Sequence, residues 1–271
     1  PNNYVDVKKE IMSDIKRTVS PSDIQNSSVI SEEVRELERE RLYIHRKELE
    51  QEITSILHRE KATKQYFVLY GPKGVGKSVL VSKCTDGKKG VVKVLISSVF
   101  NKADILQIIS TKLLGQGSST INEEEMLDVL YNAKVSDRLP TLIFEIERGN
   151  ETEQTSCIAN VRSLCKQFAV CCNCIIILSE TNAVLVFGQD AEREKIILVP
   201  ELNHNEALDF IRARQGVDMD EKEMMRLFDN VGTNAATLEC FLNEHVSIDE
   251  FIAIRMANAR EDLVAFHYSL F

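Results

Sequence analysis

Short hydrophobic runs alternate with helical patterns between residues 65 and 200. Five of these runs predict β-strands, at residues 66–70, 91–97, 141–146, 174–179 and 195–199. Two predicted helices, at about 102–114 and 123–135, separate the second strand from the third. This alternation is typical of a parallel sheet with crossover helices. The expected fold class is therefore α/β, a three-layer sandwich with a five-stranded parallel sheet.

Both ends of the chain carry helical patterns without strands. Residues 1–60 are strongly charged, and a helix start at Ser31-Glu32-Glu33 precedes apolar positions at Leu37, Ile44, Leu49, Ile53 and Leu57. This arm is either a solvated helix laid on the core or an oligomerisation element or hinge. After Pro200, helix-start pairs replace the strands: Asn203 with Glu206, Asp218 with Glu221, and Ser247 with Glu250. We expect an N-terminal helical arm (1–60), an α/β core (61–200) and a small helical C-terminal lid (201–271).

The composition of the chain limits which classes of partner it is expected to bind. Its 271 residues, 44% of them hydrophobic, suffice for one α/β core and a smaller helical unit. The net charge of −9 argues against a broad nucleic-acid-binding surface and favours small anions and proteins as partners. The sequence carries no signal-peptide pattern and no apolar stretch that could span a bilayer, so we expect an intracellular location, cytoplasmic or nuclear, and no membrane partner. The start at Pro1 is expected of an excised fragment or a trimmed product.

The seven cysteines are an odd number, which favours free thiols in a reducing compartment over a disulfide framework. The cluster Cys171-Cys172-Asn173-Cys174 also invites a zinc interpretation. However, no second Cys or His pair follows it at zinc-like spacing, so buried thiols are the favoured interpretation.

The first candidate site is the loop between the strand at 66–70 and the helix that follows it. Its eight residues, Gly71-Pro72-Lys73-Gly74-Val75-Gly76-Lys77-Ser78, match the phosphate-binding pattern G-x-x-x-x-G-K-[ST] in every fixed position. Such a loop presents backbone N–H groups and a helix N-terminus to anionic oxygens. We therefore expect ATP with Mg²⁺ as cofactors, bound by Gly71 to Ser78 and by Val79. Lys77 would neutralise the β- and γ-phosphates, and Ser78 would be a Mg²⁺ ligand.

Acidic residues at the end of the third predicted strand, 141–146, would complete this site. Glu145 is placed to join Ser78 at the metal, and Glu147, on the same side of an extended strand, to orient the attacking water. Glutamate is one methylene longer than the usual aspartate, which would disturb the metal geometry and slow hydrolysis. Alternatively, both glutamates are ordinary surface groups at a strand end.

Further polar residues follow the fourth strand and precede the fifth. Ser179, Thr181 or Asn182 would contact the attacking water, or else cap a helix. Arg193 could reach the phosphates of a neighbouring copy as an arginine finger. The competing interpretation is a surface ion-pair cluster of Arg193 with Asp190, Glu192 and Glu194.

The order of these motifs, with the helical lid, resembles the AAA+ and STAND group of P-loop ATPases over about residues 43–245. The segment from Tyr43 to Leu49 is similar to the one that precedes the P-loop in these families and lies near the adenine. The segments 199–207 and 231–238 are similar to their lid motifs. The Glu at 145, a missing sensor arginine near Ala235 and a missing lid proline favour STAND proteins over motor-type unfoldases. The sequence also resembles P-loop modules of Crinkler-like proteins from fungi and oomycetes.

Asn101-Lys102-Ala103-Asp104 spells the guanine-recognition motif N-K-x-D, but it precedes the strand at 141–146, whereas GTPases place it after. We interpret it as a helix N-terminus. Four functions remain. The favoured ones are a slow, Mg²⁺-dependent ATPase that acts as a nucleotide-controlled switch or assembly module, and a non-hydrolysing nucleotide-binding interaction module. A GTPase and a small-molecule kinase are less favoured. A homo-oligomer or a protein partner is expected for the first.

Overall fold

The computed structural model describes residues 42–97, 100–115, 121–133, 138–147, 151–178, 192–215, 220–244 and 246–269. These residues form two compact units. The first contains the described parts of 47–71 and 77–199, and the second contains those of 42–46, 72–76 and 200–271.

The first unit is built on a parallel sheet of five strands. They are β1 (Tyr66–Tyr70), β2 (Val91–Ile96), β3 (Thr141–Ile146), β4 (Asn173–Ile177) and β5 (Glu194–Leu198). Their order across the sheet is β2-β3-β4-β1-β5. The prediction of five parallel strands is confirmed, with boundaries that differ by at most two residues. This order places β1, the strand that leads into the Gly-rich loop, inside the sheet, and the strand is almost wholly buried.

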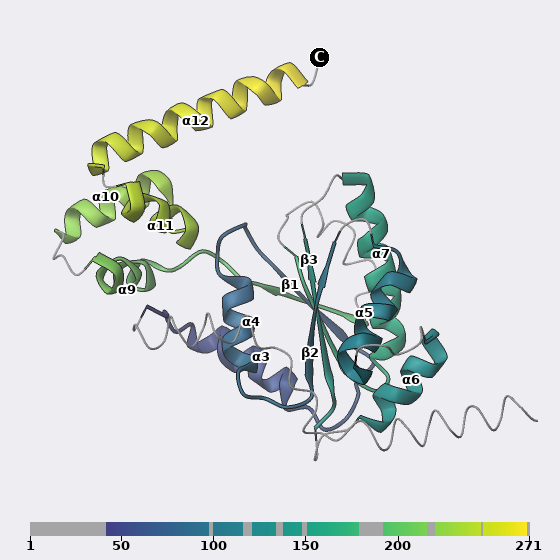
Figure 1. Ribbon diagram of the computed structural model, residues 1–271. Coiled ribbons are helices and arrows are strands. Elements are labelled where there is room, and N and C mark those ends of the chain that lie inside the picture. Colours follow the sequence, from purple (N-terminus) through teal and green to yellow (C-terminus); the bar gives the residue numbers. More distant parts are fainter. Residues whose placement is uncertain are drawn as a thin grey trace, which may run out of the picture. The chain divides into compact units, whose positions relative to one another are not determined.

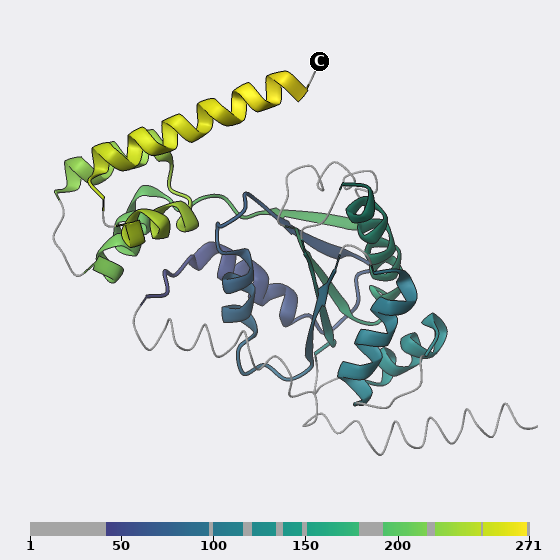
Figure 2. The same ribbon diagram turned by 45° about the horizontal axis from the view of Figure 1, so that its top comes forward.

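Helices cover both faces of this sheet (Figures 1 and 2). One face carries α3 (Lys47–Leu57) and α4 (Lys77–Thr85), and the other carries α5 (Lys102–Leu114), α6 (Glu123–Asn132) and α7 (Glu151–Phe168). The larger core lies between the sheet and α5, α6 and α7. Residues of α3 and α4 cover the second face. The predicted three-layer sandwich is therefore confirmed.

Side-chain caps fix where two of these helices begin. Asn122 and Glu125 form a reciprocal capping box at α6, as predicted, although the helix ends at Asn132 rather than near 135. Asn101 and Asp104 form the same kind of box at α5. The N-K-x-D letters therefore mark a helix start, and the box uses both the Asn101 amide oxygen and the Asp104 carboxylate.

The N-terminal arm is described only from residue 42 onward, and residues 1–41, with Ser31 and Leu37, lie outside the described residues. Its described helix, α3, buries Ile53 and Leu57 at the predicted positions and Ile56 beside them. These side chains lie in the first unit, where α3 packs on α4. Among the described helices of the whole chain, none is long and apolar enough to cross a membrane.

The second unit is helical and has its own apolar core. Its helices are α9 (His204–Gln215), α10 (Glu221–Val231), α11 (Ala235–Glu244) and α12 (Ile248–Ser269). The largest buried side chains between them are Phe210, Phe228, Phe241 and Phe251. The predicted capping box of Asn203 and Glu206 forms in both directions at 2.9 Å. Ser247 accepts a hydrogen bond from the Glu250 N–H at 3.3 Å.

The predicted cap of α10 was wrong. Asp218 lies outside the described residues, and the N-cap is Asp220, whose carboxylate accepts a hydrogen bond from the Lys222 N–H. The helix begins at Glu221, so only the residue directly before it can reach the unpaired N–H groups of the first turn.

Candidate nucleotide-binding site

The candidate loop begins at Gly71, directly after β1. The N–H of Val199, at the end of β5, donates to the Tyr70 carbonyl at 2.8 Å and brings the two chain segments together. A Cβ on Gly71 would lie 2.1 Å from the Val199 carbonyl oxygen. Only glycine therefore allows the chain to leave the sheet at this point.

Lys77 is the first residue of α4 and is buried, with 5% of its surface exposed. Its Nζ donates to the Gly71 carbonyl at 2.7 Å, across the base of the loop. Burial lowers the pKa of this ammonium to about 8, although the nearby Glu145 carboxylate opposes the change. The first turn of α4 contains no acidic residue. Lys77 and the helix N-terminus thus both favour an anion at this end of the loop.

Ser78 and Glu145 are in direct contact, because the Ser78 hydroxyl donates to one oxygen of the Glu145 carboxylate. Lys93, on β2, lies 2.5 Å from the other oxygen. β2 and β3 pair in parallel with Leu95 opposite Glu145, so Lys93 and Glu145 extend from the same face of the sheet. Both oxygens of this carboxylate are therefore engaged.

A hydroxyl and a carboxylate are hard oxygen ligands of the kind that Mg²⁺ prefers, so Ser78 and Glu145 fit the cation that the loop implies. When bound there with a nucleotide, the cation would neutralise charge on the β- and γ-phosphates. Lys93 already holds one of the Glu145 oxygens, and sequence reasoning did not find it. The available signal was a lone lysine within the apolar run from Val91 to Ile96.

Loop residues 72–76 belong to the second unit, and other residues of that unit hold three successive carbonyls of the loop. The Asn234 side chain donates to the Lys73 carbonyl at 2.8 Å, and the Ala236 N–H donates to the Gly74 carbonyl at 3.1 Å. The Arg46 guanidinium donates to the Val75 carbonyl at 3.4 Å. In a planar trans peptide, the C=O and the following N–H point in opposite directions. Fixing these carbonyls therefore directs the N–H groups of residues 74–76 away from the anchors, as a phosphate cradle requires.

Arg46 is the most buried of these anchors, with 8% of its surface exposed. It also donates to the carbonyls of Pro200 at 2.9 Å and Glu201 at 3.2 Å, and its Nε lies 3.8 Å from a Glu206 oxygen. Burial lowers its pKa, which Glu206 partly offsets. The predicted segment before the P-loop thus supplies an arginine that fastens main-chain carbonyls of the second unit.

The structure does not bring every predicted site residue to the loop. Glu147 lies one residue past β3 with an exposed side chain, and its N–H donates to the Ile96 carbonyl. Arg193 is exposed at the start of β5, where its carbonyl accepts from the Tyr66 N–H. It therefore lies at the amino ends of the strands, whereas the loop follows their carboxyl ends. Ser179, Thr181 and Asn182 lie outside the described residues.

The surface ion-pair interpretation of Glu194 was wrong. Its side chain is 1% exposed, accepts a hydrogen bond from the Tyr66 hydroxyl and forms an ion pair with Arg162 of α7. Burial, followed by the bond to Glu194, raises the pKa of Tyr66. Glu194 is buried because the Tyr66 hydroxyl and the Arg162 guanidinium enclose its carboxylate. It fastens α7 to β1 and β5 at the edge of the sheet away from the loop.

The seven cysteines are free, and six of them are buried. Burial raises the pKa of Cys157 to about 11, which makes this thiol unreactive. Among the described residues, no group of three or more His, Cys, Asp or Glu side chains could hold a metal ion, and this covers the cysteine cluster. Buried thiols, the favoured interpretation, agree with these positions.

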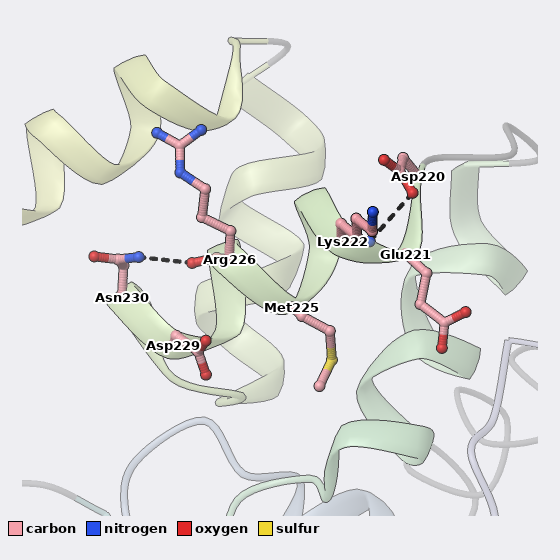
Figure 3. A pocket seen from close by; sticks show the side chains of 7 residues that line it. All are labelled: Asp220, Glu221, Lys222, Met225, Arg226, Asp229 and Asn230. Carbon is pink, nitrogen blue, oxygen red and sulfur yellow. Dashed lines mark hydrogen bonds between the residues drawn. The ribbon is translucent and has the colours of Figure 1, made fainter.

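A shallow pocket of about 540 Å³ lies along α10 (Figure 3). Its lining is confined to that helix and its cap, from Asp220 to Asn230. Two of the polar groups shown there serve the helix itself: Asp220 caps its start, and the Asn230 amide donates to the Arg226 carbonyl. The Arg226 guanidinium pairs with Asp249 of α12. The pocket is thus a solvated helix surface, and none of its lining residues belongs to the loop.

No family model matches the sequence, and no curated protein matches it either. A chain in the solved structure of Drosophila ORC bound to DNA aligns with a TM-score of 0.39 and 18% sequence identity. The alignment covers 65% of this chain and 96% of that one. The strand order is by itself typical of the P-loop core of AAA+ ATPases, with β1 between β4 and β5. The chain has an α/β fold with a five-stranded parallel sheet, followed by a helical C-terminal region.

Proposed function

We propose that the chain binds ATP at Gly71–Ser78 and is a slow, Mg²⁺-dependent ATPase that acts as a nucleotide-controlled switch. The loop itself carries this proposal. Its carbonyls are fixed by Asn234, Ala236 and Arg46, and its N–H groups are thereby directed to one side. Lys77 adds a buried positive charge at the start of α4. These are the groups that bind a triphosphate.

The contacts of Glu145 support the proposal that hydrolysis is slow. Its carboxylate is engaged by Ser78 and Lys93 at once, so it must exchange partners before it can take part in metal binding. Glu147 is the remaining acid near the end of β3 and is our candidate for orienting the water. A fast motor would need these groups preorganised for the transition state. A switch of the STAND type requires only occasional turnover.

We also propose that Arg193 acts on a nucleotide held by another copy of the chain. It precedes β5, and the loop follows the other end of β1. Five residues of strand span about 17 Å, which is more than the reach of an arginine side chain. A homo-oligomer is therefore the partner that this proposal requires.

The test compares the wild type with Lys77→Ala. We expect ATP to raise the melting temperature of the wild type and not that of the variant, and phosphate release to be slow in the wild type and absent in the variant. Lys83→Ala is the matched control, because Lys83 lies in the last turn of the same helix. Equal nucleotide binding and equal, undetectable turnover in wild type and Lys77→Ala would refute the proposal. GTP in place of ATP tests the guanine alternative.

The second candidate is a module that binds nucleotide without hydrolysing it, favoured by the contact between Lys93 and Glu145. In that case, Glu145→Gln and Glu147→Gln would leave stabilisation by ATP intact and change no rate. A large loss of phosphate release in either variant would exclude this candidate. Transfer of the phosphate to water alone would exclude the alternative that the chain is a small-molecule kinase.

A further inference from the structure

Lys93 is a charged residue at a buried strand position, where apolar residues are usual. It lies on β2 among valines and leucine, and 8% of its surface is exposed. Long side chains in such positions usually extend their charge to water. Here the Nζ is buried and lies 2.5 Å from the Glu145 Oε2. A buried ammonium is retained only when a carboxylate compensates it.

The ion pair of Lys93 and Glu145 is connected to the candidate nucleotide site through Ser78. The second Glu145 oxygen accepts from Ser78, and Ser78 follows Lys77 at the start of α4. Lys93, Glu145 and Ser78 therefore form one connected set that ends at the P-loop. An uncompensated Glu145 carboxylate at this position would repel a triphosphate, because unit charges a few ångströms apart interact strongly near a protein surface. A positive charge on its far side reduces that repulsion.

We propose that Lys93 is a built-in counter-charge for Glu145 that lets the P-loop hold a nucleoside triphosphate without a divalent cation. The inference rests on the proposed nucleotide binding at Gly71–Ser78. It makes Lys93 the residue that sets how strongly nucleotide affinity depends on Mg²⁺. Binding and hydrolysis then have different metal requirements: the loop retains ATP at any Mg²⁺ concentration, and turnover depends on the cation.

A purely structural pair would behave differently. If Lys93 only stabilised the sheet, its replacement would lower the free energy of unfolding and leave the ratio of nucleotide affinities with and without Mg²⁺ unchanged. The ratio of the two dissociation constants is therefore the informative quantity. It is also independent of catalytic activity.

The experiment titrates the full 271-residue chain with a fluorescent ATP analogue, in excess Mg²⁺ or in excess EDTA. For the wild type we expect the two dissociation constants to agree within about threefold. In Lys93→Met, EDTA should weaken binding by about 30-fold or more, because Glu145 then faces the phosphates uncompensated. Lys93→Arg keeps the charge and should behave as the wild type. Lys93→Met combined with Glu145→Gln removes both charges and should restore the small ratio.

Lys195→Met is the matched control, since Lys195 is an exposed lysine on β5, the opposite edge strand. A wild type that binds the analogue in Mg²⁺ and loses it in EDTA overturns the inference and leaves the proposed function standing. An equal ratio of the two dissociation constants in Lys93→Met and in the wild type also overturns the inference and leaves the proposed function standing. Absence of binding in every condition overturns both the inference and the proposed function. If Lys93→Met does not fold, loss of the analogue in EDTA by the wild type still overturns the inference.

Discussion

Because Lys77 is buried, we predict that alkaline pH increases its contribution to the free energy of unfolding and at the same time lowers the affinity for nucleotide. The pKa of this ammonium falls from 10.5 to about 8 on folding, mainly because burial removes its water. One pKa unit corresponds to about 1.4 kcal/mol, so the folded state carries a penalty of about 3 kcal/mol while Lys77 is protonated. The hydrogen bond to the Gly71 carbonyl returns about 1 kcal/mol of this.

The direction in which stability changes with pH follows from the number of protons bound in the folded and unfolded states. Below pH 8 the lysine is protonated in both states, and the penalty is present in full. As the pH rises through 8, the folded protein loses this proton while the unfolded chain keeps it up to 10.5, so the stability contributed by this group increases. Lys77→Met should therefore be more stable than the wild type by about 2 kcal/mol at neutral pH, and this advantage should shrink toward zero by about pH 9.5.

Urea denaturation of wild type and Lys77→Met at several pH values measures this difference directly. In parallel, the affinity of the wild type for ATP should fall by up to about tenfold for each pH unit above 8, because only the charged ammonium neutralises phosphate. A Lys77→Met variant that is less stable than the wild type at neutral pH would refute the reasoning. So would a difference in unfolding free energy that does not change with pH.

Three further outcomes follow from the described contacts. Gly74→Ala should lose about 1–3 kcal/mol of stability together with ATP affinity, because Gly74 has φ +85° and a Cβ there would lie 2.5 Å from the Ala236 Cβ; urea denaturation and nucleotide titration measure both losses. Glu194→Gln should lower the free energy of unfolding by about 2–4 kcal/mol, because it leaves a partly buried guanidinium without its counter-charge, and should not change ATP affinity. Of the seven cysteines, only Cys240 should react quickly with a thiol reagent in the native protein, because the others are buried; mass spectrometry identifies the labelled residue.

The first two of these outcomes each have a control variant within the chain. Gly87→Ala has φ +66° and open space around its Cβ, so it should cost the backbone strain alone and leave ATP affinity unchanged. Glu192→Gln, an exposed neighbour of Glu194, should have little effect. Rapid labelling of Cys172 or Cys174 would contradict the buried positions of these thiols.

The strands and the loop could be predicted from sequence because their signals are local. The run from Tyr66 to Tyr70 is apolar throughout, and the P-loop residues follow it without interruption. The five strands were therefore placed to within two residues. The start of α10 could not be placed from sequence in the same way, since Asp218 and Asp220 both precede Glu221 within one turn and only the backbone conformation selects between them.

Lys93 and Glu194 could not be predicted, because their roles depend on which strands become neighbours. Lys93 meets Glu145 only through the parallel register of β2 and β3. Glu194 stands among charged residues in the sequence, and its burial arises from Tyr66 on the adjacent strand and from α7. A strand order and a helix placement are needed before either side chain can be assigned a partner.

The anchors of the P-loop carbonyls have a consequence for the synthesis of the chain. Asn234 reaches Lys73 across 161 residues, and Arg46 reaches Pro200 across 154. Chains emerge from the ribosome from the N-terminus, so the eight loop residues appear long before Asn234 and Ala236. A nascent chain that ends before residue 200 carries the complete phosphate-binding sequence and Arg46, but it lacks the residues that hold the Lys73 and Gly74 carbonyls. Nucleotide binding should therefore begin only when the C-terminal helices have been made, which protects unfinished chains from premature occupancy.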